Sequence, residues 1–281
     1  MTSFCHIVPT GHLDLVLNRP IHLTLAHLIE EDQAYRTSYL KMKSFSKATL
    51  IMDNSAFEMF KRKEPMYPTE KLIDVANLIN ADYVIMSDYP GEPGSKTIEA
   101  AEKMIPELKR GGYGTFFCPQ SKAGDVEDLI AGYEWAFNNP DIDYIAFSIL
   151  NIPIALGCET GNPLQKYLSR YHFMRMLSER YDLVEIKKTK KFHFLGMTEG
   201  PNEILLMKDW IRLIDTWDSS AAVWAGLNGI SFDTSPTGLI EGKFEKEVDF
   251  NYQTSDDIKI ELAKSNMNYI DKLLDVSYWK N

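Results

Sequence analysis

Short apolar runs recur eight times along this chain, and helix-like stretches separate most of them. Several runs are apolar throughout, which is typical of strands that are covered on both faces of a parallel sheet. The predicted strands are residues 4–8, 21–27, 48–53, 82–88, 115–120, 143–149, 192–197 and 212–218. Because parallel strands need a crossover between them, this alternation predicts a sheet built from repeated βα units.

The helix-like stretches carry recognisable signals at their ends. Thr69 stands where an N-cap is expected, and residues 95–112 finish in a basic turn with Gly111 and Gly112, a common stop signal. Pro106 is expected to kink that second helix. The predicted helices are residues 69–80, 95–112, 125–139 and 163–181, followed by a terminal helix or helix pair at 254–275.

Eight strands alternating with helices predict an α/β fold, a (β/α)₈ TIM-like barrel. The chain of 281 residues has the length of one such domain, so we expect a single domain over residues 1–281, with residues 253–281 as a C-terminal helical extension. A doubly wound open sheet is the alternative, but no glycine-rich phosphate loop follows the first predicted strand.

Composition restricts the class of protein. No apolar run approaches the roughly 20 residues of a membrane span, and the first 20 residues lack the pattern of a signal peptide. The three cysteines, Cys5, Cys118 and Cys158, are widely spaced, which favours reduced thiols over disulfides or a zinc site. We therefore expect a cytoplasmic protein with no membrane partner and no metal.

The net charge of −10 argues against a protein that coats nucleic acid, although a local basic patch can still guide docking. Two basic runs occur, and either run taken alone is typical of a solvated surface. They are Lys61, Arg62 and Lys63, and then Lys187, Lys188, Lys190 and Lys191.

Polar residues stand at the C-terminal ends of the predicted strands. In a barrel these ends converge on one face, where active sites are built. The set consists of Asp53, Asp88, Gln120, Ser148 and Asp218, with His27 and Gly196 at the ends of two further strands. Three carboxylates and a carboxamide suit chemistry at a sugar's anomeric carbon, because one carboxylate can trap the sugar while another manages protons.

These segments resemble, in order, the tRNA-guanine transglycosylases and their DNA-acting relatives, the 7-deazaguanine DNA transglycosylases of phages and bacteria. "MDNSAFE" is similar to the family's Asp-Ser-Gly-Gly-Phe-Gln segment, which implies Asp53 as general acid/base and Phe57 as a ring stacked on the base. "MSDYPGE" and "FCPQS" resemble the base-reading segments, which implies that Asp88 and Gln120 bind the base edge.

The second half of the chain continues the resemblance. "YIAFSIL" stands where the family has a Gly-Gly-Leu turn, which implies that Ser148 and Ile149 lie against the base. "HFLGMTEGPNEILLM" resembles the stretch that places Leu195 beneath the base with Gly196 beside it. "TWDSSAAVWAGLNG" aligns with the segment of the nucleophile, which implies Asp218 in that role.

The chain also departs from the family. Ser55 and Ala56 replace the double glycine, Glu58 replaces the glutamine, and the arginine after the nucleophile is missing. No cysteine follows Cys158, whereas the tRNA enzymes carry a cysteine-rich zinc site near the C-terminus. The resemblance therefore implies exchange of guanine in DNA for a 7-deazaguanine such as preQ0, without a cofactor, in the host cytoplasm if the protein is phage-encoded.

Several alternatives stay open. The same exchange could act on tRNA, as in queuosine synthesis, or the chain could be a non-catalytic accessory barrel that binds nucleic acid. An unrelated barrel hydrolase of a small molecule is a third interpretation. The inserted base, the sequence context and a possible homodimer are undetermined. His27 is expected to be a hydrogen-bonded rim residue, and His6 and His12 have no assigned role.

Overall fold

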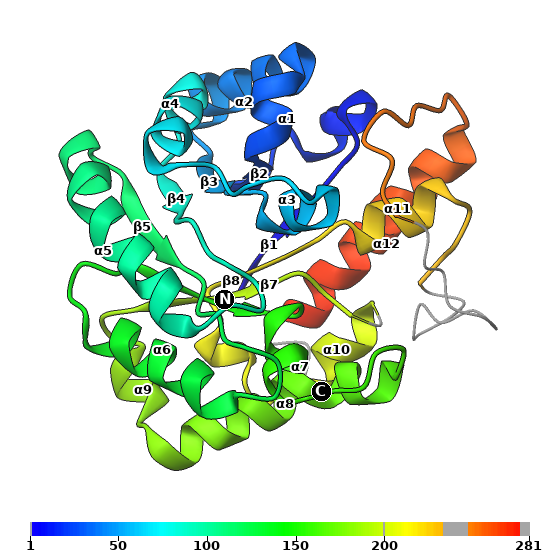
Figure 1. Ribbon diagram of the computed structural model, residues 1–281. Helices are drawn as coiled ribbons and strands as arrows, with labels where there is room; N and C mark the ends of the chain where they lie inside the picture. The colour runs from blue at the N-terminus through cyan, green and yellow to red at the C-terminus, as the bar shows by residue number, and fades with distance from the viewer. Residues whose placement is uncertain (1, 199, 233–246, 276–281) are drawn as a thin grey trace.

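The computed structural model describes residues 2–198, 200–232 and 247–275 and contains one sheet of eight parallel strands. The strand order is β1-β8-β7-β6-β5-β4-β3-β2, and β2 lies beside β1, so the sheet curls into a nearly closed barrel (Figure 1). The strands are β1 (Ser3–His6), β2 (Ile21–Leu25), β3 (Thr49–Asp53), β4 (Tyr83–Ile85), β5 (Gly114–Phe117), β6 (Tyr144–Ser148), β7 (Lys191–Leu195) and β8 (Thr216–Ser219). The predicted (β/α)₈ barrel is confirmed.

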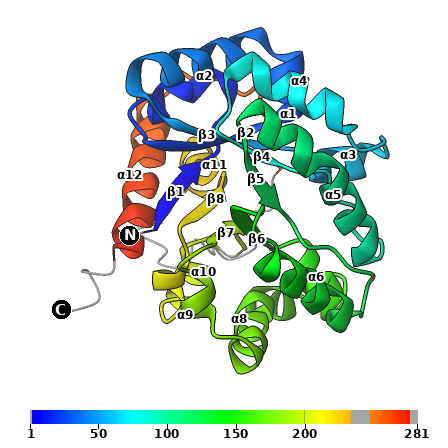
Figure 2. The ribbon, with the colours of Figure 1, turned by 90° about the vertical axis from the view of Figure 1, so that its left-hand side faces the viewer.

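Helices surround the barrel (Figure 2). The α-helices are α1 (Ala26–Glu31), α2 (Gln33–Ser46), α3 (Ala56–Arg62), α4 (Thr69–Ile79), α5 (Gly94–Gly111), α6 (Val126–Asn138), α7 (Asn151–Ala155), α8 (Pro163–Arg180), α9 (Leu183–Ile186), α10 (Pro201–Leu206), α11 (Ala221–Leu227) and α12 (Asp257–Leu274). Two 3₁₀ helices are η1 (Thr10–Val16) and η2 (Ile211–Leu213). Among the described residues, none of these helices is long and apolar enough to cross a bilayer.

The helices match their predicted ranges closely, and the strands differ more. Thr69 is the first residue of α4 and not its N-cap, which is Pro68. Pro106 lies inside α5 without ending it. The predicted eighth strand, 212–218, was placed too early, because residues 211–213 form a 3₁₀ turn in which Leu213 N donates to Trp210 O at 2.8 Å. Leu213 and Ile214 are apolar, and apolar content alone does not separate the end of a turn from a strand.

The C-terminal region forms one helix, α12, over most of the predicted extension. It packs against α11 and against β1, so it fills the position of an outer barrel helix beside the last and first strands (Figure 2). Residues 276–281 of the predicted extension lie outside the described part of the chain.

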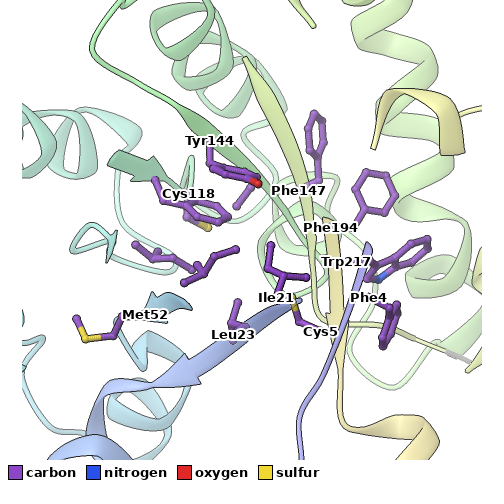
Figure 3. Close-up of a cluster of buried hydrophobic side chains, with 14 of the residues drawn as sticks. Phe4, Cys5, Ile21, Leu23, Met52, Cys118, Tyr144, Phe147, Phe194 and Trp217 are labelled. Atoms are coloured by element: carbon purple, nitrogen blue, oxygen red, sulfur yellow. The ribbon is translucent and has the colours of Figure 1, made fainter. Parts of the chain in front are cut away.

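Alternation along each strand separates two sets of buried side chains. Figure 3 shows them on the two sides of β7 and β8. Phe4, Phe147, Phe194 and Trp217 lie on the side of the surrounding helices, and Cys5, Ile21, Leu23 and Tyr144 on the side of the barrel interior. Side chains of the inward set that stand at the C-terminal strand ends are therefore directed into one mouth of the barrel.

Candidate active site

A cavity of about 730 Å³ opens at the C-terminal ends of the strands. It is lined by all nine residues that the sequence assigned to catalysis or base binding. These are Asp53, Phe57, Asp88, Gln120, Ser148, Ile149, Leu195, Gly196 and Asp218. They come from the ends of β3 to β8, from the loops that follow and from helix α3, so closure of the parallel barrel brings together side chains that are far apart in sequence.

Asp218 on β8 is buried and held by two donors on the neighbouring strand and loop. Its Oδ1 accepts a hydrogen bond from Gly196 N at 2.9 Å and lies 2.9 Å from Nε2 of His193. The ring of His193 is 0% exposed, and its Nδ1 lies 2.7 Å from the hydroxyl of Thr216. The tautomer that donates from Nε2 to the carboxylate accepts the Thr216 hydroxyl at Nδ1, so the hydroxyl fixes the orientation of the imidazole.

The backbone N–H and the backbone carbonyl of Gly196 both form hydrogen bonds with side chains. Its φ of +72° is in the region that glycine adopts freely, and a Cβ there would meet Cγ2 of Ile149 at 2.7 Å. Its carbonyl accepts from Arg170 and from Nε1 of Trp217, both at 2.8 Å. These contacts fix the amide that donates to Asp218, which is a structural reason for glycine at this position.

A buried ion pair between Arg170 and Glu203 stabilises the part of the cavity around Gly196. Nε of Arg170 donates to Oε1 of Glu203 at 2.6 Å, and another guanidinium nitrogen donates to the carbonyl of Phe147 at 3.0 Å. Oε2 of Glu203 accepts from Thr198 N at 2.7 Å. Both side chains of the pair are 0% exposed, so removing one partner would leave a buried charge. Arg170 and Glu203 were not among the predicted site residues, since their pairing depends on tertiary contacts.

Asp88 lies past the end of β4, between two amides. Oδ1 accepts from Nδ2 of Asn54 at 2.6 Å, and Oδ2 accepts from Nε2 of Gln120. Burial raises the pKa of Asp88 to about 6, although the bonds from Asn54 and Gln120 favour the charged form. Oε1 of Gln120 is buried and has no hydrogen-bond partner among the described residues, so a ligand's N–H could satisfy it.

Asp53 ends β3, and one of its oxygens accepts from Ser55 N at 2.9 Å. Burial raises the pKa of Asp53 well above its usual range, and the carboxylates of Glu58 and Asp88 raise it further. Ser55 has a φ of +58°, an uncommon conformation for a residue other than glycine. The environment thus favours Asp53 as a neutral acid, which is the form that donates a proton.

Glu58 is a fourth acidic group in the cavity lining, where the family pattern has glutamine. Burial raises the pKa of its carboxyl, and the cationic side chains of Arg62 and Lys61 act in the opposite direction. The sequence signalled this position only as a departure from the family segment.

His6, His12 and His27, to which the sequence assigned no catalytic role, occupy different positions. His27 lies in the first turn of α1 and lines the cavity, and its Nδ1 is 2.9 Å from Oγ of Ser55. Burial lowers the pKa of His27 to about 4, which favours a neutral ring. His6 lies 3.6 Å from Asp271, and Nε2 of His12 accepts from Thr254 N at 3.2 Å; neither lines the cavity.

The first basic run lies at the cavity mouth, on and just after α3. Lys61 and Arg62 belong to the lining, and both form exposed ion pairs, Lys61 with Glu247 and Arg62 with Glu31. Lys63 caps the end of α3 and is exposed.

The second basic run lies at the other end of the barrel, because it precedes the amino end of β7. Lys187 pairs with Asp215 and Lys188 with Glu185. Lys190 is buried, and its ammonium donates to the carbonyls of Asn139 and Ile142. Lys191 lies 5.0 Å from the centre of the Tyr144 ring. The structure therefore does not bring the lysines of 187–191 together with the cavity.

The barrel resembles solved structures at low sequence identity. A putative fructose-1,6-biphosphate aldolase from Coccidioides immitis matches with a TM-score of 0.52 and 10% identity, over 98% of this chain and 90% of that one. The YdjI aldolase from Escherichia coli K12 matches with a TM-score of 0.52 and 9% identity, over 98% and 91%. No protein-family model and no curated protein matches the chain. At such identities the likeness shows the fold alone.

Proposed function

We propose that the protein is a base-exchange transglycosylase that replaces guanine in DNA with a 7-deazaguanine base such as preQ0. The observation that carries this proposal is the convergence of Asp53, Asp88, Gln120 and Asp218 on one cavity of about 730 Å³. Two of these carboxylates have the environments expected of a nucleophile and of a proton donor, and the other two residues form a polar edge for a flat heterocycle.

Asp218 acts as the nucleophile. Both of its described side-chain hydrogen bonds go to Oδ1, from Gly196 N and from His193, which leaves Oδ2 for attack on C1′ of the target nucleotide. The C1′–N9 bond breaks as the C1′–O bond forms, and guanine leaves. The two donors hold the carboxylate in one orientation, so little reorganisation is needed when it attacks.

Asp53 manages the proton in both half-reactions. Its raised pKa favours the protonated acid, which gives its proton to the departing guanine. The resulting carboxylate then removes the N9 proton of the incoming 7-deazaguanine, whose N9 attacks C1′ and displaces Asp218. Asp53 ends protonated and Asp218 ends as a free carboxylate, so the cycle is balanced without a cofactor.

Asp88 and Gln120 read the edge of the base. The carboxylate of Asp88 and Oε1 of Gln120 are acceptors, and the latter is buried without a partner among the described residues. Guanine and 7-deazaguanines present N–H donors on the corresponding edge, so both bases satisfy the same acceptors. Ser148, Ile149 and Leu195 line the remainder of the base pocket.

DNA is favoured over tRNA because the chain lacks cysteines after Cys158, and with them the family's zinc site. The test incubates the protein with guanine-labelled DNA or tRNA and with preQ0, and measures guanine release and modified nucleosides by mass spectrometry. We expect labelled guanine to leave DNA and preQ0 to enter it.

An Asp218→Asn variant serves as the matched inactive control. Exchange on tRNA alone would identify the tRNA reaction instead. Binding of DNA without guanine release or a trapped covalent adduct would indicate an accessory barrel and would exclude the proposed chemistry.

A further inference from the structure

Helix α3 presents two large aromatic rings to solvent at the mouth of the cavity. The side chain of Phe57 is 51% exposed and that of Phe60 is 59% exposed. The two residues are three positions apart in a helix, so their side chains lie on neighbouring parts of its surface. Phe57 lines the cavity, and Phe60 lies about one helical turn further along α3, outside the cavity lining.

The aromatic surface of α3 is bordered by cationic side chains. Lys61, Arg62 and Lys63 follow Phe60 directly, and the ammonium of Lys61 lies 5.7 Å from the centre of the Phe57 ring. The partners of Lys61 and Arg62 are exposed carboxylates, and exposed pairs of this kind contribute little stability. A phosphate group could therefore displace them at small cost.

We propose that Phe57 and Phe60 form a stacking platform for the unpaired DNA bases next to the target nucleotide, with Lys61, Arg62 and Lys63 bound to the phosphates. Phe57 then stacks on a neighbouring base instead of on the exchanged base, which is the role that the family resemblance implies. The position of the target nucleotide rests on the proposed function. Exposed aromatic rings beside cations are the combination that binds single strands, because every base has a face to stack and every nucleotide has a phosphate.

The depth of the catalytic carboxylate explains why unpaired bases are needed. Asp218 is only 4% exposed, so the target nucleotide must leave the base stack of the DNA to reach it. The bases beside it then lose a stacking partner. Rings of Phe57 and Phe60 at the cavity mouth replace that partner, and the basic residues at the end of α3 supply charge complementary to the DNA backbone.

The test compares binding of a guanine-containing single-stranded DNA by the wild type and by Phe60→Ala. Stacking on one aromatic side chain predicts that this change weakens binding about 5- to 150-fold. Phe60→Trp should restore tight binding, because tryptophan also stacks. Phe45→Ala is the matched control, since Phe45 on α2 is 87% exposed and lies near the end of the helix that leads to the amino end of β3.

Salt dependence separates stacking from charge. Phe60→Ala should leave the slope of log affinity against log salt unchanged, whereas Lys63→Ala should reduce its magnitude by about 0.7, the value for one phosphate of a single strand. Thermal melting of each variant checks that the exposed substitutions leave the fold intact. Binding of the duplex form should be weaker than that of the single strand.

The binding measurements test the stacking platform independently of the base-exchange reaction. Equal affinity of Phe60→Ala and the wild type overturns the platform whether or not base exchange occurs, as does a loss of affinity in Phe45→Ala of the same size. Tighter binding of RNA of the same sequence overturns the assignment to DNA. If Phe60→Ala binds DNA weakly while the wild type shows no exchange, the platform stands and the proposed reaction falls.

Discussion

Nε2 of His193 lies 2.9 Å from Oδ1 of Asp218, inside the barrel and across 25 residues of sequence. The two side chains come from neighbouring parallel strands, β7 and β8, and both are directed into the barrel interior. Thr216, two residues before Asp218 on the same face of β8, holds the other ring nitrogen. Among the described residues, the ring of His193 has hydrogen-bond partners only in Thr216 and Asp218, so it orients the carboxylate of Asp218.

The first prediction concerns the nucleophile. Asp218→Asn keeps the shape of the side chain and removes the attacking carboxylate, so a covalent protein–DNA adduct should no longer be trapped. Base exchange should fall by several orders of magnitude, as expected for loss of covalent catalysis. Denaturing gels and labelled-guanine release measure the two effects. Retention of full activity in this variant would remove Asp218 from the mechanism.

The second prediction concerns the positioning role of His193. His193→Phe keeps a ring of similar size but removes the donor to Asp218. Hydrogen bonds to charged groups contribute about 1.5–3 kcal/mol, so kcat should fall about 10- to 150-fold. KM for the free base should stay unchanged, because His193 does not line the cavity.

His193→Gln provides the conservative comparison, since its amide can donate to Asp218 and should restore part of kcat. A merely structural role would lower thermal stability in both variants without this difference in kcat. Equal kcat for wild type and His193→Phe would show that the contact does not orient the nucleophile.

The third prediction concerns stability against pH. Burial raises the pKa of Asp88 from its usual 3.8 to about 6, so the native state binds the proton more tightly than the unfolded state does. The stabilisation linked to this proton is complete below pH 3.8 and is lost as the pH rises through about 6. The free energy of unfolding decreases by about 3 kcal/mol in total, because each unit of difference between the folded and unfolded pKa corresponds to about 1.36 kcal/mol.

Asp88→Asn removes this titration. The free energy of unfolding of the wild type, minus that of the variant, should therefore decrease by about 3 kcal/mol between about pH 3.5 and pH 8. Urea denaturation across this range measures the difference. A constant difference over the whole range would mean that Asp88 titrates normally in the folded protein.

The fourth prediction concerns the basic run at the cavity mouth. Replacing Lys61, Arg62 and Lys63 together with alanine should weaken DNA binding and reduce the salt slope by about 0.7 to 0.9 for each phosphate that is no longer neutralised. Binding of free preQ0 should remain. A Lys187→Ala/Lys188→Ala double variant is the control, because those lysines lie at the opposite end of the barrel. Equal slopes for the two variants would assign Lys61, Arg62 and Lys63 to an ordinary solvated surface.

The fifth prediction concerns metal. The chain has no cysteine after Cys158, and within the described ranges no group of three or more histidine, cysteine or acidic side chains is placed to hold a metal. Dialysis against a chelator should therefore leave the melting temperature and base exchange unchanged. A stoichiometric metal that is removed together with activity would contradict both the metal-free mechanism and the preference for DNA.

Much of the barrel and part of the site were predictable from local sequence. Apolar runs marked the strands and Gly112 marked the end of α5, because these signals act within a few residues, whereas Thr69 is not the predicted N-cap but the first residue of α4. In a parallel barrel the C-terminal strand ends meet at one mouth, so Asp53, Asp88, Gln120 and Asp218 could be expected together before any contact was known. The eighth strand was placed too early because Leu213 and Ile214, at the end of the turn before it, are apolar like strand residues.

Only the tertiary structure decided which partners these side chains have. It paired His193 with Asp218, Asn54 with Asp88 and Arg170 with Glu203, all between residues that are far apart in sequence. It also left Phe57 half-exposed at the mouth and separated the two basic runs to opposite ends of the barrel. Hydrogen bonds, burial and pKa values depend on distances between atoms of different strands, and strand pairing and barrel closure set those distances, whereas residue spacing along the chain does not.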